Sequence, residues 1–242
     1  MKDIRSILAV LLIAAIIPSL SGCASLSGCG RSNKSPGTKT IVLSTDGDMN
    51  VTLDMVQLPN QVWFGKYEVT HAQWESVNGD KPSGFEGGDN PVECISWDDC
   101  QMFLRKLNAM PSVKESGLAF RLPTEEEWEY ACRAGATGEY CRLADGTEIT
   151  ESTLDQVAWF DDNSDRKSHP VGRKKPNAFG LHDMNGNICE WTSTEDGEYR
   201  VYHGGCWRNS AENCEISNRI RLSPRFRFND LGFRLCADGK AD

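Results

Sequence analysis

The sequence predicts an α+β domain in which two helices pack on a small twisted sheet and much of the chain forms long irregular loops. Two segments combine a helix-capping pattern with apolar residues at helical spacing, and several short segments alternate as strands do. Other stretches show little regular period. A chain of 242 residues with 39% apolar content is enough for one domain with a full core.

The expected strands are short and rich in β-branched residues. Three lie early in the chain, at residues 41–44, 51–58 and 62–69, and two lie late, at residues 198–203 and 233–236. We expect these segments to form the sheet.

Two helices are marked by their first residues. Ser96 with Asp99 makes a capping box, and apolar residues follow at helical spacing: Trp97, Cys100, Phe103, Leu104 and Leu107. Thr124 with Glu127 makes a second capping box. The inner face of that helix is expected to hold Trp128, Ala131 and Cys132, and Gly135 is expected to end it.

Two long segments, residues 140–163 and 204–230, carry little regular period. In a compact domain such segments usually mark functional loops.

The N-terminus has the pattern of a lipoprotein signal. Lys2 and Arg5 precede an apolar run at residues 7–20 that is short for a membrane span, and residues 20–23 form a lipobox. The pattern implies cleavage after residue 22, acylation of Cys23 and a lipid anchor on the outer membrane or cell surface. The alternative is an ordinary cleaved signal. We expect a signal peptide at residues 1–22, a Ser- and Gly-rich tether at 23–40 and the domain at 41–242.

The charge of the chain disfavours nucleic acid as a partner. The net charge is -9, and removal of Lys2, Arg5 and Asp3 with the signal takes away a net +1 and leaves -10. Such a domain lacks the long-range attraction that a phosphate backbone requires.

Several motifs follow one another in a recognisable order. They are GKYEVTHAQWESV from Gly65, PVECISWDDC from Pro91, FRLPTEEEWEYACRAGA from Phe120, HPVGRKKPNAFGLHDMNGNICEW from His169, GGCWRNSAENC from Gly204 and LGFRLC from Leu231. Over residues 62–236 they resemble the formylglycine-generating-enzyme family, a variant of the C-type lectin fold. The resemblance implies that fold.

One departure from the family's pattern argues against its oxidase chemistry. Its oxidases bind copper with two cysteines five positions apart, and soft thiolates suit Cu(I). The second cysteine corresponds to Cys214, but the first corresponds to Asn209, whose amide cannot replace a thiolate. Cys206 could pair with Cys214 in a disulfide or an improvised metal site. An iron-dependent branch uses a histidine-rich site, but the four histidines here lack metal-ligand spacing. We expect no enzyme activity and no catalytic cofactor.

At least one cysteine is expected to be unpaired. With Cys23 acylated, nine of the ten remain, an odd number. Cys100 and Cys132 fall on apolar helix faces, and Cys189 lies where the family usually carries an apolar residue. We interpret these three as buried small hydrophobic residues, with disulfides as the alternative.

A loop at residues 183–191 resembles the family's structural calcium site. The matching ligands are Asp183, Gly186, Ile188 and Glu190, and oxygen ligands of this kind suit Ca²⁺. The alternative is a tight Asn/Gly turn whose side chains satisfy its own backbone.

The C-terminal region also resembles the variable proteins of diversity-generating retroelements, in which asparagine codons are rewritten at adenines. Such rewriting cannot yield Lys, Glu, Gln, Met or Trp, and none of these occurs in residues 216–230. Residues 219–228 alternate basic with apolar side chains. Alternation alone fits a strand with Ile220, Leu222, Phe226 and Phe228 inward. Pro224 interrupts it, and exposed Phe beside Arg is typical of binding hot spots.

We therefore expect a membrane-anchored lipoprotein that displays a diversified surface, within residues 200–236, to an unknown ligand that we take to be a protein. The alternatives are a copper-dependent thiol oxidase and a structural envelope lipoprotein. The expected binding residues are His203, Cys206, Arg208, Asn209, Ser210, Asn213, Ile220, Leu222, Ser223, Arg225, Phe226, Arg227, Phe228 and Asn229.

Overall fold

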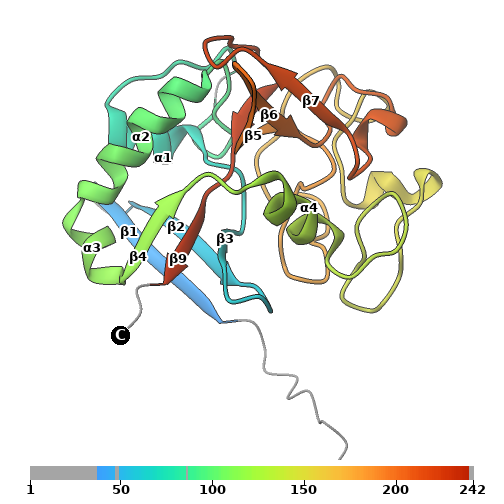
Figure 1. Cartoon of the computed structure of the whole chain (residues 1–242), viewed down its shortest axis with the longest axis horizontal. Coiled ribbons are helices and arrows are strands. Elements are labelled where there is room, and N and C mark those ends of the chain that lie inside the picture. The colour runs from blue at the N-terminus through green and yellow to red at the C-terminus, as the bar shows by residue number, and fades with distance from the viewer. Residues whose placement is uncertain (1–36, 47–48, 86, 240–242) are drawn as a thin grey trace, which may run out of the picture. The chain divides into compact units, whose positions relative to one another are not determined.

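Two β-sheets form the framework of the domain (Figure 1). The computed structural model describes residues 37–46, 49–85 and 87–239; the expected signal and Cys23 lie outside these residues. The larger sheet has the order β1 (Thr38–Asp46), β2 (Met49–Gln57), β3 (Trp63–Gly65), β9 (Cys236–Gly239) and β4 (Leu118–Arg121). The smaller sheet has the order β7 (Arg219–Leu222), β6 (Tyr199–His203), β5 (Cys189–Asp196) and β8 (Leu231–Phe233).

The two predicted capping boxes are confirmed. Ser96 caps α2 (Trp97–Ala109) and Thr124 caps α4 (Glu125–Arg133). In each box the cap side chain accepts a hydrogen bond from the backbone N–H of the third helical residue, and the side chain of that residue accepts one from the backbone N–H of the cap. The last helical turn of α4 leads into Ala134, which adopts the left-handed conformation one residue before the expected stop. The expected inner faces are buried, apart from a half-buried Trp97.

Two further α-helices were not expected, α1 (His71–Asn78) and α3 (Pro111–Ser116). α1 also begins with a capping box, Thr70 with Gln73, but it buries only Trp74 and therefore shows no apolar period. Short 3₁₀ helices lie in the expected irregular regions, η1 (Glu151–Gln156) and η2 (Ala211–Cys214).

Three expected strand boundaries are wrong. β1 begins at Thr38, so the strand includes residues assigned to the tether. The strand expected at residues 62–69 pairs only over Trp63–Gly65. The late strand at residues 233–236 is two strands, because the chain leaves the smaller sheet after Phe233 and enters the larger one at Cys236. Arg234 lies in this crossing.

The main core lies where α1 and α2 meet the crossing chain. Trp74 stacks on Phe103 with 5.2 Å between ring centroids, and Phe103 meets Phe233 edge to face at 5.3 Å. The remaining buried side chains of α2 are also part of this cluster. Burial of this aromatic and aliphatic surface is the main driving force for the fold.

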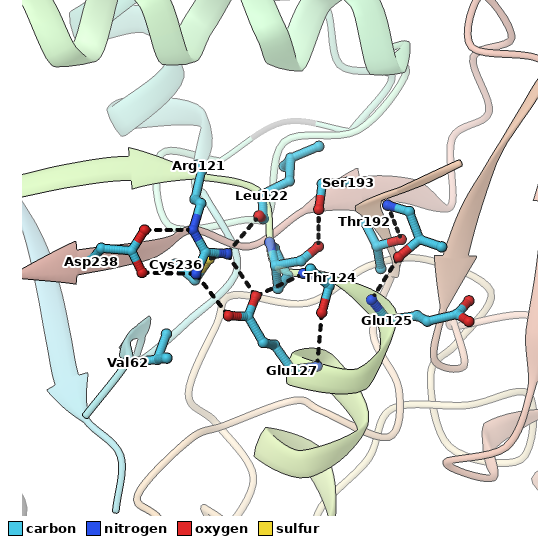
Figure 2. Close-up of polar contacts among 12 residues, drawn as sticks. Val62, Arg121, Leu122, Thr124, Glu125, Glu127, Thr192, Ser193, Cys236 and Asp238 are labelled. Atoms are coloured by element: carbon cyan, nitrogen blue, oxygen red, sulfur yellow. Dashed lines mark hydrogen bonds and ion pairs between the residues drawn. The ribbon is translucent and has the colours of Figure 1, made fainter. Parts of the chain in front are cut away.

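Arg121 connects the larger sheet to the start of α4 (Figure 2). Its guanidinium donates two hydrogen bonds to Glu127, at 2.6 and 2.7 Å, and two to Asp238, both at 2.9 Å. These bonds lower the pKa of Asp238. Burial acts to raise the pKa of Glu127, but the bonds from Arg121 and from the backbone at Thr124 leave it lowered.

We expect replacement of Arg121 by methionine to lower the free energy of unfolding near pH 7 by about 1–2 kcal/mol, the usual worth of charged hydrogen bonds at a partly exposed site. Both carboxyl pKa values are depressed in the folded state. The free energy that these two ionised carboxylates add to folding is therefore complete above pH of about 4. It is lost as the pH falls through the pKa values that Glu127 and Asp238 have in the folded protein.

Urea unfolding of wild type and Arg121→Met at neutral and acidic pH measures this effect. The difference between the two proteins should shrink towards pH of about 2.5. Arg105→Met, an exposed change on α2, is the matched control. An equal difference at both pH values would contradict the role given to the carboxylates.

Candidate functional site

The C-terminal segment runs along the outside of the smaller sheet. It follows β6 through Gly204 and Gly205, forms η2 and β7, turns at residues 223–226 and returns through Asp230 to β8. β7 is an outer strand of this sheet, near the upper right of Figure 1. The strand alternative is therefore right for Arg219–Leu222, where Leu222 packs against the main core but Ile220 is exposed.

Most of the expected binding residues are accessible. Phe226 is 52% exposed and Phe228 is 39% exposed. Asn209, Leu222 and Ser223 are half-buried. The others that the structure exposes are Arg208, Ser210, Asn213, Ile220, Arg225, Arg227 and Asn229. We call the exposed side chains of Arg208, β7 and residues 225–229 the C-terminal surface.

The expectation is wrong for His203 and Cys206, which are fully buried. His203 points inward from β6 and stacks on Trp128 at 5.2 Å between ring centroids. Burial lowers the pKa of His203, so the ring is neutral near pH 7. Neither side chain can contact a ligand at the surface.

The position that would need a copper-binding thiolate holds an amide with a structural role. The Asn209 side-chain oxygen accepts hydrogen bonds from the Cys206 backbone N–H and from its thiol, both at 3.0 Å. A Cβ on Gly205 would collide with Cys214, so the chain packs directly on that sulfur. Burial raises the pKa of Cys214, which keeps it a thiol.

The eight cysteines that the structure describes are unpaired, Cys206 and Cys214 among them. Cys100, Cys132 and Cys189 are buried, which confirms their interpretation as small apolar residues. The Cys189 thiol lies against the Gly204 carbonyl at 3.3 Å. Its hydrogen bond with Cys206 and its burial raise its pKa.

Two neighbouring phenylalanines form a platform in the C-terminal surface. The rings of Phe226 and Phe228 are nearly parallel, with an interplanar angle of 9° and centroids 6.1 Å apart. The loop that carries them is held by the segment just before α2, because the Cys94 N–H donates to the Phe228 carbonyl at 3.0 Å. Arg227 adds a bidentate ion pair with Asp99 of α2. The platform is therefore pre-organised.

The C-terminal surface presents arginines outward and their carboxylate partners inward. The Arg208 side chain is 51% exposed and its partner Asp230 is 8% exposed; for Arg227 and Asp99 the values are 53% and 15%. Arg219 pairs with Glu125 at 2.8 Å and with Asp196 at 3.2 Å. A partner approaching this surface meets guanidinium groups and aromatic rings first.

The expected calcium ligands do not fit an ion as they are arranged. Both oxygens of Glu190 are bound by Arg234, at 2.8 to 3.2 Å, and one also accepts from the Trp128 indole at 2.6 Å. Asp183 uses one oxygen to accept from the Gly172 N–H at 2.7 Å and keeps one buried oxygen without a partner. Each carboxylate oxygen of Glu190 already accepts two hydrogen bonds, so neither is free to bind an ion. The Arg234 guanidinium supplies the positive charge next to this carboxylate.

Two residues of this buried cluster were not expected, Glu68 and Arg234. Glu68 accepts hydrogen bonds from the Asn187 side chain and the Ile188 N–H, and burial raises its pKa well above the ordinary value. Burial raises the pKa of Asp183 to about 6. One signal was available in the sequence: Glu68 is the only acidic residue in the strand expected at residues 62–69. The loop is thus held by contacts with other segments of the chain, and its polar side chains do not satisfy its own backbone as the turn alternative required.

We expect calcium to leave the thermal stability unchanged. An ion that bound only the folded state would add about 2.7 kcal/mol at one hundred times its Kd, which is several degrees in Tm. Thermal unfolding in EDTA and in millimolar CaCl₂ measures this. A calcium-dependent rise in Tm that is lost in Asp183→Asn would show that the loop rearranges to bind the ion.

Within residues 37–46, 49–85 and 87–239 the structure has no group of three His, Cys, Asp or Glu side chains placed to hold a metal. No helix among these residues has the length and apolar character needed to cross a membrane.

The chain is similar to proteins of known name along most of its length. A chaperone protein named LppX from Paenibacillus barcinonensis is 30% identical, with 94% of this chain and 96% of the relative covered. The inactive Cα-formylglycine-generating enzyme 2 of Bos taurus is 29% identical over 71% of this chain and 58% of that relative.

Solved structures share the fold. Treponema denticola variable protein 1 has a TM-score of 0.64 and 28% identity, with 84% of this chain and 92% of that chain covered. PvdO from Pseudomonas aeruginosa has a TM-score of 0.61 at 21% identity and supports the fold alone. Residues 36–239 match the sulfatase-modifying factor enzyme 1-like domain. The chain therefore belongs to the formylglycine-generating-enzyme-like family defined by this domain, and it has that family's α+β, C-type-lectin-like fold.

Proposed function

We propose that this protein is a membrane-anchored lipoprotein that binds a partner protein through its C-terminal surface and catalyses no reaction. The observation that carries the proposal is the exposed pair Phe226 and Phe228, held rigid by α2 and surrounded by arginines. Aromatic residues and arginine dominate protein-binding hot spots, and a pre-organised site loses little entropy on binding.

The absence of catalysis is supported by the chemistry around Asn209. Its amide is engaged by Cys206, and the Cys214 thiol is buried and protonated, so no pair of thiolates is available at this place. Two of the relatives are named as a chaperone and as an inactive enzyme, and a protein that binds another protein without chemistry fits both names.

Diversification of the surface is supported by the separation of buried and exposed residues in the C-terminal segment. Trp207 and Asp230 are buried, and apart from Cys214 and Ile216 the residues between them are exposed or half-buried. Substitutions at exposed positions usually change stability by no more than about 0.5 kcal/mol. Many different surfaces could therefore be built on this fold.

We expect the DNA downstream of the gene to carry a near-copy of the last codons, differing only at adenines and adjacent to a reverse transcriptase gene. Sequencing the locus and the C-terminal codons from several strains tests this. A constant C-terminus with no such copy would favour the structural envelope lipoprotein instead.

We expect Cys23→Ser to move the protein from the membrane to the soluble fraction, because the lipid anchor is attached at this thiol. Detergent-phase partition and the mass of the mature N-terminus measure the change. Cys29→Ser, six residues further along, is the matched control and should leave the protein in the membrane. Equal partition of the two variants would contradict acylation at Cys23.

A further inference from the structure

β7 has an unpaired outer edge. Among the residues that the structure describes, it pairs only with β6, in an antiparallel register that places Ile220 opposite Tyr202 and Arg221 opposite Val201. In an antiparallel strand, alternate residues direct their N–H and C=O groups away from the neighbour. The outer edge of β7 therefore offers hydrogen-bonding groups to another extended chain.

The phenylalanine platform lies next to this edge in the chain. A turn closed by the Phe226 N–H and the Ser223 carbonyl, at 3.1 Å, connects β7 to Phe226. Ile220 of β7 is also exposed. A strand added to β7 would thus run towards an apolar platform that can accept a large side chain.

The charge along the edge is positive although the protein as a whole is negative, at -9. Arg219 and Arg221 lie on β7 and Arg225 follows the turn, all of them exposed. The nearby carboxylate of Asp196 is 3.2 Å from Arg219 and 3.7 Å from Arg221, and it is less exposed than either arginine. Arg219 also pairs with Glu125 at 2.8 Å, so Arg225 and the more exposed Arg221 carry most of the positive charge that faces solvent.

These features select one class of occupant. A second copy of this chain would bring β7 arginines against β7 arginines, and like charges directly opposite destabilise a strand pair. Nucleic acid and anionic membranes are extended polyanions, which the net charge of the protein repels outside this narrow surface. A short acidic segment of a protein matches both the cations and the narrow edge.

Resting on the proposed function, we propose that the partner contributes an extended acidic segment that adds as a strand to the outer edge of β7 and places an apolar side chain on Phe226 and Phe228. Main-chain hydrogen bonds supply the register, and the arginines select Asp and Glu in the segment.

The experiment is selection from a displayed library of random peptides on the whole protein, followed by affinity measurement with synthetic copies of the enriched peptides. We expect enriched sequences to combine Asp or Glu with one large apolar residue. Arg221→Glu/Arg225→Glu should weaken their binding by at least about tenfold, or 1.4 kcal/mol. The matched control is Arg105→Glu/Lys114→Glu, which reverses two exposed charges on α2 and α3.

Backbone methylation of the selected peptides tests strand addition directly. N-methyl groups at alternate residues should abolish binding, and those at the intervening residues should have little effect, because only every second N–H faces β7. Equal effects at all positions, enrichment of peptides without acidic residues, or no enrichment at all would overturn the partner proposed here.

Phe226→Ala/Phe228→Ala separates this inference from the proposed function. Tyr130→Ala, an exposed aromatic change on α4, is the control, and the Tm of each variant verifies folding. Loss of peptide binding in the phenylalanine variant but not in the control would support the proposed function, that is, binding through the C-terminal surface. This holds even if the selected peptides are not acidic. Unchanged binding in a folded phenylalanine variant would reject both.

Discussion

The buried ion pair between Arg234 and Glu190 is the interaction on which the rest of the structure depends. Arg234 lies where the chain passes from β8 to β9, and its guanidinium also donates to the carbonyls of Gly65 and His182. Glu190 lies in β5 and accepts from Trp128 of α4. One pair therefore connects both sheets, a helix and the loop before β5. Breaking such a pair from one side leaves an uncompensated buried charge, a loss of about 3–5 kcal/mol.

This arrangement leaves the C-terminal surface free to differ without endangering the fold. β5 is held by Glu190, and β8 lies parallel to it with Glu190 opposite Gly232. The surface segment leaves this scaffold after Trp207 and rejoins it at Asp230. Its anchors lie far away in the chain, such as Asp99, which pairs with Arg227, and Glu125, which pairs with Arg219. The buried side chains of Cys214 and Ile216 also hold it. The exposed side chains between these anchors contribute little to stability, which suits the changing binding surface proposed above.

The surroundings of Asn209 and Cys214 do not suit a copper ion. A copper site needs two thiolates that a metal can reach, whereas here Cys214 lies beneath Gly205 and the neighbouring position is an amide that closes a turn with Cys206. These positions hold a buried thiol and the hydrogen bonds around Asn209. In the loop before β5, the Arg234 guanidinium supplies the positive charge beside Glu190.

The sequence alone determined the fold class and the starts of α2 and α4, because capping boxes, apolar periodicity and the family's motifs can be recognised without the structure. It left open whether Phe226 and Phe228 face inward or outward, and the structure exposes both. It could not decide which residues of the C-terminal segment face inward. His203 and Cys206 have the same polar or reactive character as surface residues, but β6 and the turn at Asn209 bury them. The break between β8 and β9, the partnership of Glu68, Glu190 and Arg234, and the free edge of β7 were decided only by tertiary structure, since each depends on residues far apart in the chain.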